Sequence, residues 1–340
     1  MRHLTSALLA VALCSVTLVG AACRRSTIPA ALNDHEFWSL IEALSEPAGT
    51  FTHSANLVSN EPHFPEVVRR LTPSRGAYIG VGPEQNFTYV AALRPAIAFI
   101  IDIRRENLSL HLLYKALFEM SADRVDFVSR LFSRPTPRGL TAAASVDEIF
   151  DQFEHAPISP QHYDRTLALV RDRLMVTHKL PVSQEDLYWI EHVLKTFYTD
   201  GPRIDYYGSR SLETVRPSYR QLMTAKDFDG RSRSFLGSEG SFAFVKDLQS
   251  RNMIVPVVGD FGAVGTNGAM RRVGEYVRAH HDRIHAVYGS NVAVYLTNQQ
   301  AFAFCENLGT LPAASRAWFI DGVGMRSLDS RLRACVAETK

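Results

Sequence analysis

The residues best suited to chemistry lie around a glycine-containing segment, Gly80-Val81-Gly82-Pro83-Glu84-Gln85. Asp102 follows 20 residues after Gly82, at the end of an apolar stretch. Glycines at such a turn let the backbone approach a ligand, and an acid at this spacing accepts hydrogen bonds from ribose hydroxyls. The pattern therefore predicts a nucleotide-type site built from a strand, a turn, a helix and a second strand.

Two residues of this segment bear on the identity of the ligand. Gln85 stands where the dinucleotide fingerprint has its third glycine, and Glu84 lies in the first turn of the expected helix. A helix N-terminus attracts phosphate through its free amides, and a carboxylate there repels a pyrophosphate. S-adenosylmethionine has no phosphate and carries a sulfonium and an ammonium group. The chemistry therefore favours S-adenosylmethionine over NAD, and an NAD-linked oxidoreductase is the less favoured interpretation.

Further polar residues lie where a ligand could reach them. Asp260 and Asn291 end predicted strands, and ligands of open α/β sheets bind at those ends. Glu61 precedes the first strand and could orient a substrate. We name Asp260 and Glu61 as candidate general bases, although loop capping and a solvated turn are open alternatives. The candidate cofactor-binding residues are Gly80, Gly82, Glu84, Gln85, Asn86, Asp102 and Asn291.

The sequence contains no pattern that supports several other kinds of chemistry. The string Gly237-Ser238-Glu239-Gly240 lacks the Gly-x-Ser-x-Gly spacing of a serine hydrolase. Cysteine and histidine show no zinc-ligand spacing, so no metal is expected. Lys and Arg number 37 against 35 Asp and Glu, and a net charge of +2 gives no support for broad nucleic-acid binding. Arg104 and Arg105 could contact an adenine or an acidic substrate, but we expect them at a solvated helix start.

The elements that must position these residues alternate along the chain. Continuous apolar runs, such as Ala96 to Ile103, indicate strands that are buried on both faces, as in a parallel sheet. Strand alternating with helix predicts an α/β fold with a doubly wound, Rossmann-like, mostly parallel sheet. One further predicted strand begins at Tyr78. Three more cover Met253 to Val258, Ile284 to Tyr288 and Ala317 to Ile320.

The chain divides into three stretches. Residues 1–22 are expected to be a signal peptide, and residues 23–75 an N-terminal tether and helical segment. Residues 76–340 are expected to form the Rossmann-like domain. Within it, residues 125–200 show helical spacing almost throughout and predict a helical insertion.

The first 23 residues predict export. An apolar stretch from Leu8 to Val19 is followed by small residues and Cys23, as in a bacterial lipobox. We expect a periplasmic or envelope protein that meets the membrane only through a possible lipid anchor at Cys23. A buried N-terminal helix is the alternative. In an oxidising compartment Cys305 and Cys335 could pair, although two buried thiols are equally open.

Residues 76–106 and 253–291 resemble the nucleotide-binding half of class I S-adenosylmethionine-dependent methyltransferases. Gly80 and Gly82 match the family's Gly-x-Gly loop, and Asp102 matches the acid that ends its second strand. Asp260 loosely matches the polar residue that ends its fourth strand. Tyr78 departs from the family, which has an acid two residues before the first glycine. The run from Gly80 to Phe87 is also similar to an uncharacterised group of bacterial exported proteins.

Two functions follow as expectations. The first is an exported methyltransferase-like protein that binds S-adenosylmethionine or a related nucleoside and acts on an unidentified substrate. The second is a non-enzymatic envelope lipoprotein that uses the fold as a scaffold for a ligand or a partner. Export separates the protein from its cytosolic methyl donor, and this conflict favours the second function.

Overall fold

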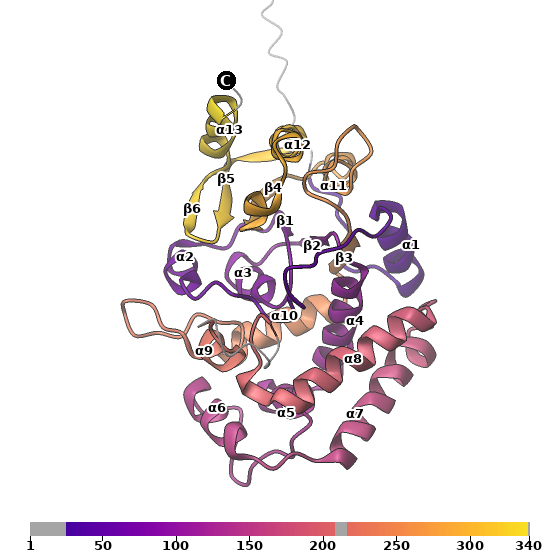
Figure 1. Cartoon of the computed structure of the whole chain (residues 1–340), viewed down its shortest axis with the longest axis vertical. Coiled ribbons are helices and arrows are strands. Elements are labelled where there is room, and N and C mark those ends of the chain that lie inside the picture. Colours follow the sequence, from indigo (N-terminus) through magenta and orange to yellow (C-terminus); the bar gives the residue numbers. More distant parts are fainter. Residues whose placement is uncertain (1–24, 208–215, 339–340) are drawn as a thin grey trace, which may run out of the picture.

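The protein has a Rossmann-like α/β fold with a mostly parallel sheet, as predicted. The computed structural model describes residues 25–207 and 216–338, and its described strands form one sheet in the order β3-β2-β1-β4-β5-β6 (Figure 1). The first five strands in chain order pair in parallel, and β6 is antiparallel to β5. The strands are β1 (Ala77–Gly80), β2 (Ile97–Asp102), β3 (Ile254–Val258), β4 (Ile284–Ser290), β5 (Ala313–Asp321) and β6 (Gly324–Ser327).

Strand β3 closes one edge of the sheet. It carries Pro256, which cannot donate to a neighbouring strand and is therefore tolerated at an edge. The free edge is covered by the chain that follows helix α1, because the Glu46 N–H donates to the carbonyl of Val258. Helix α1 itself begins with a capping box at Asn33 and packs on β3. The segment predicted as an N-terminal tether and helical segment thus shares the core of the sheet.

Helices cover both faces of the sheet. Helices α3, α4 and α10 pack together on one face, while α1 and α11 contact each other and the sheet on the other. The helices around the sheet are α1 (Asp34–Leu44), α2 (Phe64–Arg70), α3 (Gln85–Leu93), α4 (Arg105–Met120), α10 (Glu239–Ser250), α11 (Ala269–Ala279), α12 (Asn298–Thr310) and α13 (Leu328–Glu338).

The insertion is helical, as predicted, and lies at the end of the molecule opposite α13 (Figure 1). Serine caps explain where two of its helices begin: Ser159 caps α7, and Ser183 forms a capping box with Asp186 at α8. The insertion and the elements after it are α5 (Arg124–Leu131), α6 (Val146–His155), α7 (Pro160–Asp172), η1 (Arg173–Thr177), α8 (Gln184–Asp200), η2 (Gly201–Arg203) and α9 (Tyr219–Thr224).

A cluster of phenylalanine rings joins the insertion to the sheet domain. Phe118 of α4 lies between Phe87 of α3, at 5.1 Å between ring centroids, and Phe127 of α5, at 4.6 Å. Edge-on and offset ring pairs of this kind add to the burial of apolar area. The insertion is therefore continuous with the core.

A disulfide joins Cys305 of α12 to Cys335 of α13, with 5.8 Å between their Cα atoms. This settles the alternative between a pair and two free thiols in favour of the pair. None of the helices in the two described ranges is long and apolar enough to span a bilayer. The predicted signal peptide and Cys23 lie outside the described residues.

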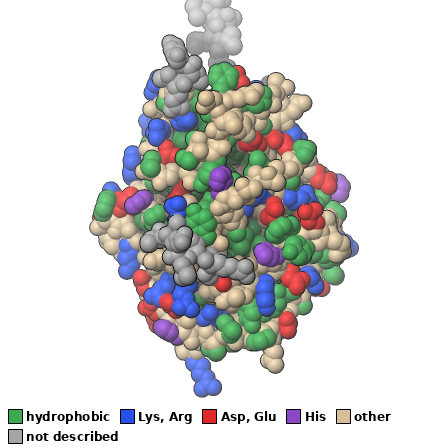
Figure 2. Space-filling view, viewed as in Figure 1, with side chains coloured by type: hydrophobic (Ala, Val, Ile, Leu, Met, Phe, Trp, Pro, Cys, Tyr) green, Lys and Arg blue, Asp and Glu red, His purple; other side chains and the backbone are tan. Residues whose placement is uncertain are grey.

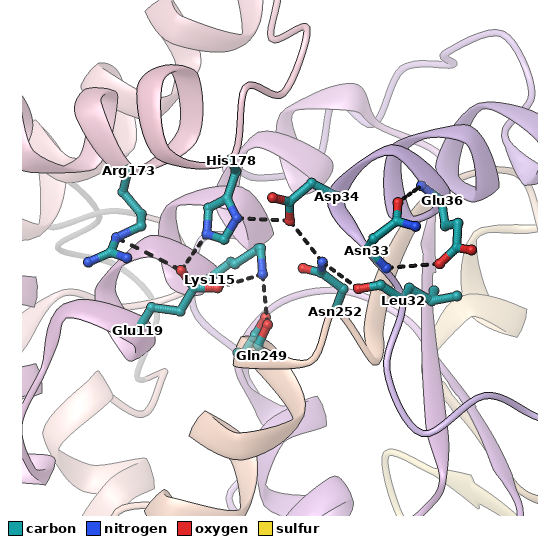
Figure 3. A network of polar contacts seen from close by, with 10 residues as sticks. All are labelled: Leu32, Asn33, Asp34, Glu36, Lys115, Glu119, Arg173, His178, Gln249 and Asn252. Carbon is teal, nitrogen blue, oxygen red and sulfur yellow. Dashed lines mark hydrogen bonds and ion pairs between the residues drawn. The ribbon is translucent and has the colours of Figure 1, made fainter.

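A buried polar network connects the insertion with α1 (Figure 3). His178 follows η1, and its Nδ1 lies 2.9 Å from a carboxylate oxygen of Asp34 while its Nε2 lies 2.6 Å from Glu119. Lys115 is 1% exposed and donates to Glu119 at 2.6 Å and to the carbonyl of Gln249 at 2.7 Å. Both ring nitrogens of His178 face carboxylates, so the arrangement favours the doubly protonated ring.

The first prediction concerns this network. The hydrogen bond to Glu119 raises the pKa of His178 above 6.5. Its contribution to stability is therefore complete below that value and is lost as pH rises through the folded-state pKa. His178→Gln should lower the free energy of unfolding by about 2 kcal/mol near pH 6. The loss should shrink towards alkaline pH in urea titrations. The exposed His192→Gln is the control, and an equal loss at every pH would contradict the assignment.

Candidate functional site

A cleft of about 230 Å³ lies at the carboxyl edge of the sheet. Its floor comes from the residues that follow β1, β2, β3 and β4. Strands β1 and β4 are neighbours, although the chain passes through β2 and β3 between them. This is the switch point at which open α/β sheets bind ligands. The residues that line the cleft include Gly82 and the polar or aromatic residues Phe51, His53, Asn60, Asp102, Arg104, Tyr206, Asp260, Tyr288, Ser290, Asn291, Tyr295 and Gln300.

The turn after β1 is shaped by Asn86. Its side-chain amide donates to the carbonyls of Val81, Gly82 and Pro83 at 2.9, 3.1 and 2.7 Å. The hydroxyl of Tyr78 donates to the same side chain at 2.9 Å. A Cβ on residue 80 would collide with Asn86 and Tyr78, and Gly82 has a positive φ of 76°. The two glycines are therefore required by the turn itself.

Glu84 and Gln85 lie beneath the turn and not in the cleft. Both are fully buried, as is Asn86. The backbone N–H of Ser59 donates to both carboxylate oxygens of Glu84, at 3.1 and 3.2 Å, and burial raises the pKa of Glu84 to about 8. The segment that carries Ser59 covers the start of α3, so the side chains at the helix start face the core. Contact between a ligand and these three predicted side chains would require that segment to move.

His111 was not singled out by the sequence. It lies on α4, is 2% exposed, and its Nε2–H donates to the carbonyl of Gly82 at 2.9 Å. Burial lowers the pKa of His111 to about 4, so the ring is neutral near pH 7. His111 thus supports the turn from below. A single histidine on an apolar helix gives no sequence signal for this role.

Asp102 reaches the cleft, as predicted, but it is paired. The carboxylate accepts from the backbone N–H and Nε of Arg104 at 3.0 Å each, and from Nη2 at 3.2 Å. A carboxylate has about four acceptor positions, so roughly one stays free for a ligand. The expectation of a solvated Arg104 is wrong, because Arg104 is 6% exposed and also donates to the carbonyl of Ala55. Arg105 pairs with the buried Asp186 at 2.8 Å.

Asp260 and Asn291 both line the cleft, from opposite sides of β1 and β2. Asp260 accepts from the backbone N–H of Gly262 at 2.7 Å and from Gln300 at 3.2 Å. The match of Asp260 to a fourth strand is wrong, because β3 precedes it and lies at the edge beside β2. Strand β4, next to β1, ends at Ser290, and Asn291 follows it.

Glu61 lies behind the cleft wall. It is 6% exposed, and its carboxylate accepts from the hydroxyls of Tyr288, at 2.9 Å, and Ser290. Burial raises the pKa of Glu61. The structure therefore brings this predicted residue against β4, and it adds Ser290, which the sequence did not single out as functional.

An aromatic rim lines the mouth of the cleft. The ring of Tyr295 lies 5.0 Å from Phe51 and 4.9 Å from His53, and Tyr206 lines the same cleft. The sequence placed Phe51 and His53 in the N-terminal tether and helical segment, outside the Rossmann-like domain, so this wall was missed. On the face shown in Figure 2, hydrophobic side chains show in a central hollow among charged groups of both signs.

The sheet order, the turn after β1 and the position of the cleft define a Rossmann-like protein with a cleft at the switch point. The chain belongs to the family described as a domain of unknown function (DUF7790), whose model matches residues 56–334. No curated protein matches the sequence. Within the described ranges, no group of three or more His, Cys, Asp or Glu side chains is arranged to hold a metal ion.

The second prediction tests the support of the turn. Asn86→Ala removes the side-chain donor of three carbonyls, of which Gly82 keeps His111 and Pro83 keeps the backbone N–H of residue 86. The variant should lower the free energy of unfolding by about 2 kcal/mol. Tyr78→Phe removes one hydrogen bond and should cost about 1 kcal/mol. Urea denaturation of both variants measures the difference, and the exposed Asn298→Ala is the control. An Asn86→Ala protein as stable as the wild type would exclude this role.

Proposed function

We propose that this protein binds an uncharged or cationic molecule of nucleoside type in the cleft, with S-adenosylmethionine as the leading candidate. One observation carries the choice: the cleft at the switch point is lined by two carboxylates, Asp102 and Asp260, against one guanidinium, Arg104. The charges of these three side chains sum to one net negative charge. Such a field attracts cations and repels phosphate.

This site offers few groups that could bind a phosphate. Arg104 is already engaged by Asp102 and Ala55. The start of α3, where a pyrophosphate would bind, is covered by the backbone of Ser59 and the carboxylate of Glu84. These contacts make a dinucleotide such as NAD the less favoured ligand.

The lining offers partners for the parts of S-adenosylmethionine. The free acceptor position of Asp102 suits a ribose hydroxyl, the aromatic rim suits a flat base, and Asp260 suits the ammonium group. Binding pockets for small molecules usually measure about 300–1,000 Å³, so a ligand of this length would extend through the mouth of the cleft. When bound, S-adenosylmethionine would supply an electrophilic methyl group. Because Asp260 would hold the ammonium group, Glu61 is then the proposed proton acceptor of this chain.

A scaffold without catalysis is the second candidate. Glu84, Gln85 and Asn86 are buried in the support of the turn, and Tyr78 occupies the position of the acid that binds the methionine end in methyltransferases. These features favour a protein that has kept the fold and its cleft for a different ligand or for a partner.

We further propose export to the periplasm or envelope, with a lipid anchor at Cys23. The disulfide between Cys305 and Cys335 supports this location, because disulfides persist in oxidising compartments and are rare in the cytosol.

The third prediction is a binding measurement. Calorimetry of the mature protein should detect S-adenosylmethionine at micromolar to millimolar concentration, and NAD should give no signal. Asp260→Asn should weaken binding about tenfold, which corresponds to about 1.4 kcal/mol. S-adenosylhomocysteine, which lacks the sulfonium charge, should bind less tightly. Glu275→Gln on α11 is the control. No heat with S-adenosylmethionine or adenosine at millimolar concentration would sink the nucleoside proposal.

The fourth prediction concerns the compartment. Cells grown with labelled palmitate should incorporate label into the wild-type protein and not into Cys23→Ser. Protein recovered from the envelope should carry no free thiol at Cys305 or Cys335, as alkylation and mass spectrometry will show. Unlabelled wild-type protein with both thiols free would contradict export and acylation together.

A further inference from the structure

Ser290 occupies a strained turn at the floor of the cleft. It is the last residue of β4 and has φ +47°, a left-handed conformation that a residue with a side chain rarely adopts. The chain then passes directly into the short helix η3 (Val292–Tyr295). A sharp, strained turn between a strand and a helix is the device that exposes a nucleophilic serine above a sheet in hydrolases. Ser290 lines the cleft, so a ligand there can reach its hydroxyl.

The hydroxyl of Ser290 already has a proton acceptor. It donates to one carboxylate oxygen of Glu61, while Tyr288 donates to the other at 2.9 Å. Glu61 is 6% exposed, and within residues 25–207 and 216–338 the groups that hydrogen-bond to its carboxylate are the hydroxyls of Ser290 and Tyr288. A buried carboxylate without a cationic partner is costly to the fold. Such a group calls for a role other than stability.

Several titratable groups surround Glu61 and bear on its proton affinity. Asp321 lies on β5 and pairs with Arg326 of β6 at 2.8 Å. Its negative charge opposes ionisation of Glu61, as burial does, while the two hydroxyl donors favour it. The nearby titratable side chains are Tyr78 of β1, Tyr89 of α3, Tyr288 of β4 and Asp321 of β5.

We propose that Ser290 and Glu61 form a nucleophile and general-base pair, and that the cleft hydrolyses small carboxylic esters. The proposal goes beyond methyl transfer and rests only on the nucleoside-binding cleft proposed above. Glu61 takes the proton of Ser290 as Oγ attacks the carbonyl carbon. The ester C–O bond then breaks, and the leaving alkoxide receives that proton from Glu61. Water attacks the acyl-serine with Glu61 again as base, which releases the acid and restores the serine.

The lining of the cleft defines the substrate class. The amide side chains of Asn60 and Asn291 line the same cleft as Ser290 and can donate to the oxygen of a carbonyl group. The aromatic rim of Phe51, His53 and Tyr295 accepts a flat ring. We therefore infer an ester of a short acid with an alcohol that carries an aromatic or nucleoside ring.

A purely structural role gives a different expectation. In that case, the hydroxyls of Tyr288 and Ser290 only hold Glu61 and so fix residues 57–61 against β4. Removal of either hydroxyl would then destabilise the fold without any reactive serine being present. Covalent reactivity separates the two roles, because a serine that merely donates a hydrogen bond does not react with a fluorophosphonate.

The fifth prediction is tested with a fluorophosphonate probe on the mature wild-type chain, followed by peptide mapping. Ser290 should carry the modification. Its rate should rise with pH as Glu61 loses its proton, and Glu61→Gln should slow it about a hundredfold. The exposed Ser250→Ala should react like the wild type.

Two results would overturn the proposal. One is an unmodified Ser290 under conditions in which a standard serine hydrolase reacts. The other is an unchanged rate in a folded Glu61→Gln protein. Mapping on the wild-type chain keeps the test valid if Ser290→Ala fails to fold. The probe contains no nucleoside, so a failure to bind S-adenosylmethionine and a failure of Ser290 to react are separate outcomes.

Discussion

The cleft depends on how the carbonyl groups of one buried turn are satisfied. Buried carbonyls that lose their donors cost free energy, and those after β1 have no strand partner. Asn86 and His111 supply the donors from the core side of the turn. Their position leaves the opposite side of the turn open as the floor of the cleft. Glu84 extends the same support, because it accepts the backbone N–H of Ser59 and so fixes the neighbouring wall.

The sheet and the floor of the cleft could be predicted because they follow from local patterns. Apolar runs bounded by glycine turns identified the strands, and parallel strands bring their carboxyl ends to one edge. Gly82, Asp102, Asp260 and Asn291 accordingly line one cleft. The strand beside β1 could not be chosen in this way, since strand order depends on pairings between distant segments. The sequence therefore matched Asp260 to the wrong strand.

The walls of the cleft could not be predicted from local patterns in the sequence. Glu84 and Gln85 are buried because residues 57–61 cross the start of α3, which is a contact between segments far apart in the chain. Arg104 is buried for a similar reason, since the carbonyl of Ala55 lies beside it. Ser290 belongs to no sequence motif that would mark it as functional. Its strained backbone and its contact with Glu61 are seen only in the three-dimensional structure.

The family match begins at residue 56, while Phe51 and His53 of the aromatic rim precede it. The shared region thus contains the floor and the opposite wall but not this side of the mouth. A recombinant fragment cut at the family boundary would lose α1 and the chain that covers the edge of β3, together with this side of the entrance. Its ligand preferences would therefore not represent those of the intact chain.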